Sequence, residues 1–358
     1  MPSLKEIKGR INSISSTLAI TSAMKMVASA KLQKAQMAIQ NMLPYERRLY
    51  SMLVDLMGAM NISAAASEDG SVRGSGSAER GFDQSGDRLS LSNRHDLAGM
   101  DGAYSLMAQR EVRKVAIVAF ASNSSLCGAF NSNAIREATA VINEYRASGL
   151  GDADITVYSV GRKMAEAMKK LGFPSPADFT KMSDSPSYDA ASALAQELFD
   201  GFVSGRFDKV ELVYNHYKST SSQPTTRQTY LPLSLADAIA DLQAGKIADS
   251  ASESDTNRGA EPVGAPVVRQ GSPTTEGLIV EPSKEALIAT LLPKVVRLRV
   301  FTTLLDSAAA EHAARTVAMQ LATDNGNDLL QELTLEYNKG RQQKITSEIL
   351  DLVGGSIQ

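Results

Sequence analysis

The sequence is poor in the residues that usually build catalytic centres and covalent cross-links. Among 358 residues there are one cysteine, three histidines and no tryptophan, and aromatic residues make up only 5%. The single cysteine, Cys127, excludes an internal disulfide and is typical of a reducing compartment. Because His95, His216 and His312 lack metal-ligand spacing, no metal site is predicted.

Long apolar runs and a strong net charge are also missing. No apolar stretch reaches the about 18 residues of a transmembrane helix. The formal net charge of -3 gives no global sign of nucleic-acid binding. The opening MPSLKEIKGRI is too polar for a signal peptide. We therefore expect a cytosolic protein, or one held at a membrane only through its partners.

One long stretch lacks acidic residues. No Asp or Glu lies between Glu6 and Glu46, although this stretch contains several lysines and an arginine. A helix exposed to water normally alternates charges and gains from i,i+4 pairs. Small residues and methionines occupy many of the remaining positions, as in ITSAMKMVASAKLQKAQ. This composition predicts a helix enclosed by a smooth, apolar and partly acidic partner surface.

The same stretch carries a heptad pattern. Apolar residues recur at spacings of three and four from Leu4 to Leu56, interrupted only by Thr21, Lys25 and Glu46. Such a seam, held over many heptads, predicts a coiled-coil helix roughly 80 Å long. Pro44 predicts a kink in it.

A second long helix is predicted at the C-terminus. It begins after Ser283, a suitable N-cap, and continues almost to the terminating glycines at 354–355, with a bend near Pro293. The alanines of 308–310 and 313–314 match the small residues of the first helix and suggest the same smooth partner. Its last turns lose the heptad pattern, so we expect the tip to run on without its partner helix.

The two helices can pair in two ways. They form an antiparallel coiled coil within one chain if the middle of the chain folds back, or each pairs with another copy of itself. The intrachain arrangement, with a domain inserted at one end, is favoured.

The middle of the chain alternates strands and helices. Strands are predicted at 114–122, 155–161 and 210–217, with 226–232 beside the last, and helices at about 133–146, 162–171 and 190–203. This order predicts a small, largely parallel, Rossmann-like α/β domain. The fold class is therefore α/β, with a long antiparallel coiled coil of the terminal helices.

The predicted organisation has five parts. They are an N-terminal coiled-coil helix (1–60), a flexible insertion (61–110), the α/β domain (111–243), a flexible linker (244–276) and a short strand with the C-terminal helix (277–358). Both flexible segments are rich in Ser, Gly, Asp and Ala and cannot bury enough apolar surface to fold. The first could act as a mechanical brake or be merely tolerated at an exposed site, and the second interpretation is favoured.

Several local motifs resemble parts of catalytic or binding sites, but none is complete. The loop SNSSLCGAFNSN follows a strand, where phosphate loops lie, but it has one glycine, Gly128, and no following Lys-Ser or Lys-Thr. Cys127 lacks a basic neighbour in sequence and is interpreted as a buried structural thiol. Glu311-His312 has no second histidine at i+4, so zinc is not expected there. No catalytic residue and no cofactor is predicted, and the chain alone is not expected to be an enzyme.

Long segments at both ends resemble one known family. The opening SLKEIKGRINSI and ITSAMKMVASAKLQKAQ resemble the first helix of F-type ATP synthase gamma subunits. The segment SAAAEHAARTVAMQLATDNGNDLLQELTLEYNKGRQQKITSEILDLVGG is similar to the closing helix of that family, and SSLCGAFNSN to its central-domain loop. In that loop Ser125 departs from the more usual glycine.

The resemblance implies a central-stalk rotor without catalytic residues of its own. It implies a coiled coil that penetrates the hexamer of alpha and beta subunits, and an α/β domain beside the epsilon subunit and the membrane c-ring. Such a protein would be peripheral, at the cytoplasmic face of a bacterial inner membrane, and would couple proton flow to ATP synthesis. Because a sleeve would surround the shaft, the resemblance accounts for its small, apolar and basic surface.

The resemblance also implies contact residues for loops of the beta subunits. These are Met24 and Lys25 on the first helix and Arg315, Arg341, Gln342 and Thr346 on the last. Gly340, where the family often has alanine, locally weakens the helix by up to ~1 kcal/mol. For each position the alternative is an ordinary residue facing the partner helix.

Other function classes fit the sequence less well. A coiled-coil scaffold that displays a ligand-binding domain as a homo-oligomer would need an exposed polar face on the first helix. A nucleotide-using enzyme would need a richer glycine loop, and a nucleic-acid-binding helix would need more arginine.

Overall fold

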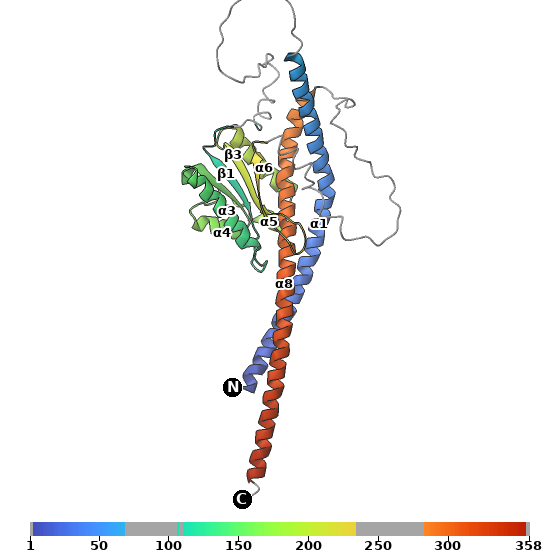
Figure 1. The fold of residues 1–358 in the computed structure, drawn as a ribbon, viewed down its shortest axis with the longest axis vertical. Coiled ribbons are helices and arrows are strands. Elements are labelled where there is room, and N and C mark those ends of the chain that lie inside the picture. The colour runs from blue at the N-terminus through green and yellow to red at the C-terminus, as the bar shows by residue number, and fades with distance from the viewer. Residues whose placement is uncertain (1–2, 69–105, 107–109, 234–282, 356–358) are drawn as a thin grey trace, which may run out of the picture.

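Two long helices from opposite ends of the chain lie side by side. The computed structural model describes residues 3–68, 106, 110–233 and 283–355. Helix α1 (Leu4–Glu68) and helix α8 (Lys284–Gly355) run antiparallel and form what we call the shaft (Figure 1). They pair within one chain, so the favoured arrangement is confirmed. Ser283 caps α8, since its Oγ accepts from the N–H of Ala286 at 3.2 Å.

The register of the shaft is constant along its lower half. Leu4 packs at Gly340 and Leu18 at Gly326, and Thr323 Oγ1 donates to Thr21 Oγ1 at 3.1 Å. A Cβ at Gly326 would lie 2.6 Å from Leu18 Cδ2, so this glycine permits a close approach of the two helices. Every position of the predicted seam is buried or half-buried, which confirms the heptad prediction. Pro44 and Pro293 both lie inside uninterrupted helices.

The α/β domain is a four-stranded sheet with the order β2-β1-β3-β4. Strands β1 (Val115–Phe120), β2 (Ile155–Val160) and β3 (Lys209–Asn215) are parallel, and β4 (Thr225–Leu231) pairs antiparallel with β3. The largely parallel sheet is therefore confirmed. Its side chains alternate between two cores. Val118 and Phe120 face the core that includes helix α6 (Tyr188–Val203) and both shaft helices. Ile117 faces the core formed with helices α3 (Phe130–Ala147) and α4 (Arg162–Lys170).

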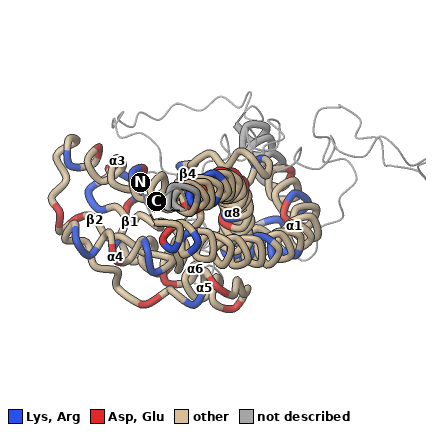
Figure 2. Tube along the Cα trace, turned by 90° about the horizontal axis from the view of Figure 1, so that it is seen from below, with Lys and Arg blue, Asp and Glu red and all other residues tan. Residues whose placement is uncertain are grey.

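The helices of the domain lie close to the predicted ranges. They are α3 (Phe130–Ala147), α4 (Arg162–Lys170) and α6 (Tyr188–Val203). The sequence did not predict α5 (Thr180–Asp184) or the 3-10 helix at Asp152–Asp154, because a single turn leaves no periodic pattern. Viewed along the shaft, α8 lies between α1 and the sheet (Figure 2).

The structure revises one boundary and leaves the flexible segments outside its described residues. Helix α1 continues to Glu68, eight residues beyond the predicted end of the first coiled-coil segment at 60. The rest of the predicted insertion, apart from residues 106 and 110, falls in the ranges 69–105 and 107–109, which are not described. The linker 244–276 and the short strand expected before α8 also lie outside the described residues.

The alanines of α8 have a different neighbour from the one predicted. Ala309 and Ala313 pack against Leu32 of α1, and Ala310 packs against Cys127 and Phe130 of the α/β domain. All three alanines are fully buried within the chain. The prediction that they face an external sleeve is wrong, because the small side chains let α8 fit between α1 and the domain.

Candidate partner-contact surface of the shaft

The end of α8 extends beyond the end of α1. Leu4 of α1 lies beside Gly340, and every residue from 341 to 350 of α8 is exposed. Both termini lie at this end of the molecule (Figure 1). We call residues 341–355 the tip. The expectation that the tip runs on without its partner helix is confirmed.

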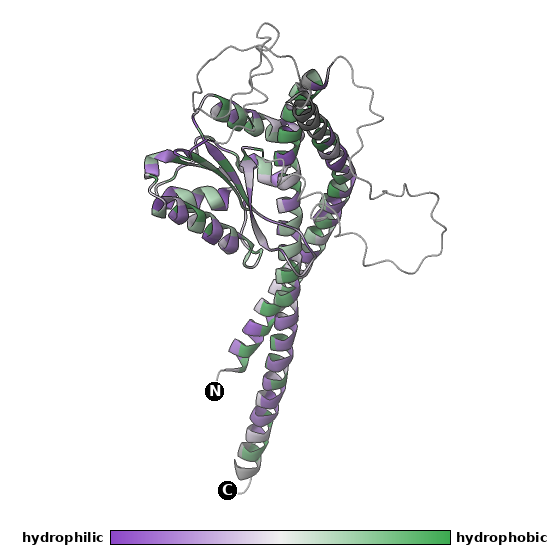
Figure 3. Ribbon diagram, turned by 45° about the horizontal axis from the view of Figure 1, so that its top comes forward, coloured by the Kyte–Doolittle hydropathy of each residue, from purple (hydrophilic) through white to green (hydrophobic). Residues whose placement is uncertain are grey.

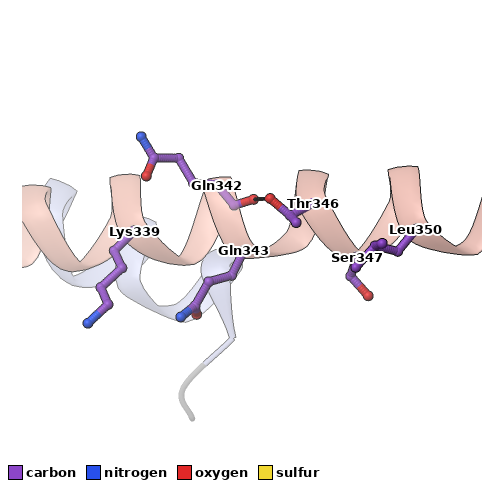
Figure 4. A pocket seen from close by; sticks show the side chains of 6 residues that line it. All are labelled: Lys339, Gln342, Gln343, Thr346, Ser347 and Leu350. Carbon is purple, nitrogen blue, oxygen red and sulfur yellow. Dashed lines mark hydrogen bonds between the residues drawn. The ribbon is translucent and has the colours of Figure 1, made fainter.

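Three of the predicted contact residues lie in the tip. Arg341, Gln342 and Thr346 are all exposed on α8. Gln342 and Thr346 line a shallow hollow on one helix face, together with Lys339, Gln343, Ser347 and Leu350 (Figure 4). Thr346 Oγ1 donates to the backbone oxygen of Gln342 at 2.9 Å, so its hydroxyl is held against its own helix. The hollow presents amide, hydroxyl and ammonium groups, which suit hydrogen bonding to a polar partner loop.

Apolar side chains are exposed on the same end of α8. Leu335, Ile349 and Leu352 expose 64%, 54% and 74% of their surface. Green patches recur along the part of α8 that leaves the domain (Figure 3). Several large apolar residues on one protruding helix indicate a surface that a partner covers.

Arg315 is engaged within the chain. Its guanidinium donates to Glu311 Oε1 at 2.7 Å and to Ser124 Oγ at 2.8 Å, and its side chain is only 12% exposed. Burial raises the pKa of Glu311, which Arg315 partly offsets. Burial also lowers the pKa of the neighbouring His312 to about 4, helped by the positive charges of Arg315 and Lys31. Arg315 therefore joins α8 to the loop after β1, a contact that the sequence did not reveal.

Met24 and Lys25 lie half-buried on α1. The shaft register places them opposite the neighbourhood of Met319 on α8, so they are well separated along the shaft from the tip. The residues that protrude here are Ile20, Met26 and Val27, which expose 61%, 65% and 58%. Met26 is one of the methionines outside the heptad seam that the sequence indicates as partner-facing, whereas Ile20 and Val27 carry no signal beyond being apolar and outside the seam.

The loop after β1 contacts α8 directly. Cys127 is buried, which confirms its structural interpretation, and its sulfur accepts from Asn131 Nδ2 at 3.1 Å. Gly128 has a φ of +57° and lies against Ala318 of α8. The loop therefore holds the shaft, which gives it a structural task at the position where phosphate loops occur in other α/β domains.

The described part of the chain has no helix long and apolar enough to cross a membrane. Within the same residues, no group of His, Cys, Asp and Glu is arranged to hold a metal ion.

The chain is similar to known proteins over its whole length. A family model described as ATP synthase matches residues 3–357. The ATP synthase gamma chain of Phocaeicola vulgatus is 47% identical over 357 residues, and that of Bacteroides thetaiotaomicron is 44% identical over 358, each covering 100% of both chains.

Solved structures show the same fold. A chain of the Euglena gracilis mitochondrial ATP synthase rotor has 18% identity and a TM-score of 0.51, covering 96% of this chain and 98% of that one. A chain from the OSCP/F1/c-ring structure of the same enzyme has 20% identity and a TM-score of 0.53, covering 98% and 92%. With these relatives and the match of the family model, the chain belongs to the ATP synthase gamma chain family.

Proposed function

We propose that this chain is the central rotor shaft of an F-type ATP synthase. Its partners are the alpha and beta subunits, which surround the shaft, and the epsilon subunit and the c-ring, which lie at the domain end. The chain itself supplies no catalytic group, and the ATP chemistry belongs to the assembly. It is peripheral to the membrane, at its cytoplasmic face.

One observation carries this proposal. The part of the shaft that leaves the domain exposes large apolar side chains on both helices, and the α1 stretch between Glu6 and Glu46 has no acidic residue. An isolated coiled coil in water gains nothing from such a surface. A sleeve around the shaft buries the apolar groups and, if it carries acidic loops, complements the lysines of α1.

The shape of the shaft provides the asymmetry that rotary coupling needs. Helix α8 continues as a single helix where α1 has ended, and the α/β domain lies on one side of the pair (Figure 1). Three otherwise identical catalytic subunits would therefore meet different faces of the shaft. A difference in contact free energy shifts each subunit towards a different conformation, and rotation passes those conformations from one subunit to the next.

Co-expression with the alpha and beta subunits tests the proposal. Native mass spectrometry is expected to show three alpha, three beta and one copy of this chain, and the same sample is expected to hydrolyse ATP. A homo-oligomer that ignores alpha and beta would support the coiled-coil scaffold instead.

A further inference from the structure

The turn between β3 and β4 reaches both helices of the shaft. Residues 216–224 connect these strands, and His216 N still donates to the oxygen of Pro224 at 2.8 Å, which extends the ladder towards the turn. Asn215, at the end of β3, is buried and donates to the oxygen of Phe130 at 3.1 Å. The base of the turn is thus fixed to the sheet.

Asp306 of α8 receives two hydrogen bonds from this turn. Its Oδ1 accepts from the backbone N–H of Tyr217 at 2.8 Å, and its Oδ2 lies 2.7 Å from His216 Nδ1. The carboxylate is only 17% exposed. Because the two oxygens bind two successive residues, the turn cannot rotate about α8 without breaking one of these bonds.

Tyr217 continues the connection to α1. Its hydroxyl accepts from Gln36 Nε2 at 2.6 Å. Its ring packs against the cluster of Leu32 and Ala309, which lies between the two shaft helices, and against the cluster around Cys127. One residue of the turn therefore contacts α1, α8 and the loop after β1.

These contacts lie where the shaft leaves the domain. Nearer the start of α8, two further hydrogen bonds join it to the domain. Tyr230 of β4 donates to the backbone oxygen of Val296 of α8 at 2.9 Å, and Arg297 of α8 donates to Gln196 of α6 at 2.6 Å. Beyond Ala318, α8 continues with α1 alone. Below the level of Asp306 the domain touches α8 again through the bond from Arg315 to Ser124 and the packing of Gly128 on Ala318. Among the described residues, however, only the level of Asp306 and Tyr217 has hydrogen bonds to both shaft helices.

We propose that Asp306 and Tyr217 form a clamp that passes torque from the α/β domain into both shaft helices. Apolar contacts are non-directional and allow sliding, whereas hydrogen bonds hold a fixed geometry. Asp306 prevents the domain from turning about α8, and the bond from Gln36 to Tyr217 makes α1 turn with it. This role rests on the proposed rotor function and adds the residues that position the domain on the shaft.

The test uses single-molecule rotation of the complex assembled with alpha and beta subunits. The hexamer is fixed to a surface, a bead is attached to the α/β domain, and the angular variance of the bead is measured during pauses. Tyr217→Phe keeps the ring and removes the hydroxyl, and Asp306→Ala removes both acceptors. Variance is inversely proportional to torsional stiffness, and Tyr230, Arg297 and Arg315 also tie the domain to α8. Losing one tie of the clamp is therefore expected to raise the variance measurably, but by less than about twofold. Ser221→Ala, in the exposed part of the same turn, is the matched control and should behave as wild type.

The outcomes separate a clamp from a merely structural contact. If the two residues only stabilise the fold, the variants lower the yield of complex but leave the variance of assembled molecules unchanged, which overturns the clamp. If Asp306→Ala does not fold, an unchanged variance for Tyr217→Phe overturns the clamp by itself. If the wild-type complex does not assemble or rotate, the rotor function fails and the clamp with it.

Discussion

Gly161 shows how strongly a single residue can constrain this fold. It follows β2, and a Cβ there would lie 2.0 Å from the backbone oxygen of Ala121. Its φ of +97° is also a conformation that side chains disfavour. Gly149 has nearly the same φ, +98°, but nothing lies within 4 Å of its Cβ position. An alanine at Gly149 would suffer backbone strain alone, whereas an alanine at Gly161 would suffer both backbone strain and steric overlap.

We expect the two alanine substitutions to differ widely. Gly149→Ala should lower the free energy of unfolding by about 1 kcal/mol, the cost of placing a side chain at positive φ. Gly161→Ala should cost several times more, because the backbone of the loop after β1 must also move. Chemical denaturation followed by circular dichroism measures both. Equal losses of unfolding free energy would show that the backbone at Ala121 moves away from the new Cβ at almost no cost.

The pair of His216 and Asp306 makes stability depend on pH. The hydrogen bond that His216 donates to the Asp306 carboxylate raises the pKa of His216 above its ordinary value, while partial burial and the charge of Lys218, on the same turn, act in the opposite direction. The folded pKa thus exceeds the unfolded one. The ion pair stabilises the fold fully below the unfolded pKa, and this contribution is lost as the pH rises through the folded pKa.

Asp306→Asn is therefore expected to destabilise the fold more at acidic pH than at basic pH. The difference in melting temperature between wild type and variant should be larger at about pH 6 than at about pH 9. The effect should stay below about 1 kcal/mol, because the imidazole is partly exposed. Asp328→Asn removes the same charge from an exposed site on α8 and should show no such trend. A pH-independent difference for Asp306→Asn would mean that the Asp306 carboxylate does not shift the pKa of His216 in the folded state.

At the scale of the helices, one buried ion pair interrupts the apolar seam of the shaft. Glu46 occupies a heptad position and is 1% exposed. Arg299 of α8 donates to its Oε1 at 3.1 Å, and Thr302 Oγ1 donates at 3.2 Å. Burial raises the pKa of Glu46, and Arg299 opposes this shift. The pair therefore fixes which residues of the two helices meet, at a cost in desolvation.

We expect removal of one partner to be worse than removal of both. Arg299→Met leaves a buried, unpaired carboxylate and should lower the free energy of unfolding by about 3 kcal/mol. Glu46→Leu combined with Arg299→Met restores an apolar seam and should recover most of that loss. Chemical denaturation of Arg299→Met, Glu46→Leu and the double variant measures the three losses of unfolding free energy. If the double variant is as unstable as the sum of the two single variants, the pair does not act as a unit.

How far the sequence predicts this fold depends on the kind of pattern that each element leaves. The heptads predicted α1 and its pairing with α8, because burial on one helix face imposes a period. The same period did not reveal which surface buries Ala310, since an apolar neighbour from the α/β domain and one from a sleeve look identical in sequence. For Arg315, the pair with Glu311 follows from i,i+4 spacing on one helix, whereas the bond to Ser124 depends on three-dimensional proximity alone. The resemblance placed Arg341 and Gln342 on the closing helix, and their role as partner contacts stays a prediction.

At the scale of the whole molecule, the two helices divide the shaft into a paired part and a single-helix tip. Leu4 marks the boundary at Gly340. This division allows two truncations with different consequences. Ending the chain after Gly340 removes only the tip, whereas ending it after Gln331 also removes the residues on which the first turns of α1 pack.

Both truncations should leave the α/β domain folded, because its described contacts with α8 lie between 287 and 318. If the tip residues contact the beta subunits, each truncation should weaken proton-coupled ATP synthesis by the assembled complex in membrane vesicles. The cut after Gln331 should have the larger effect, since it also frees the end of α1. Normal synthesis by both variants would contradict the assignment of Arg341, Gln342 and Thr346, and would place the coupling contacts on the paired part of the shaft. A loss after Gln331 alone would assign the effect to the paired helices.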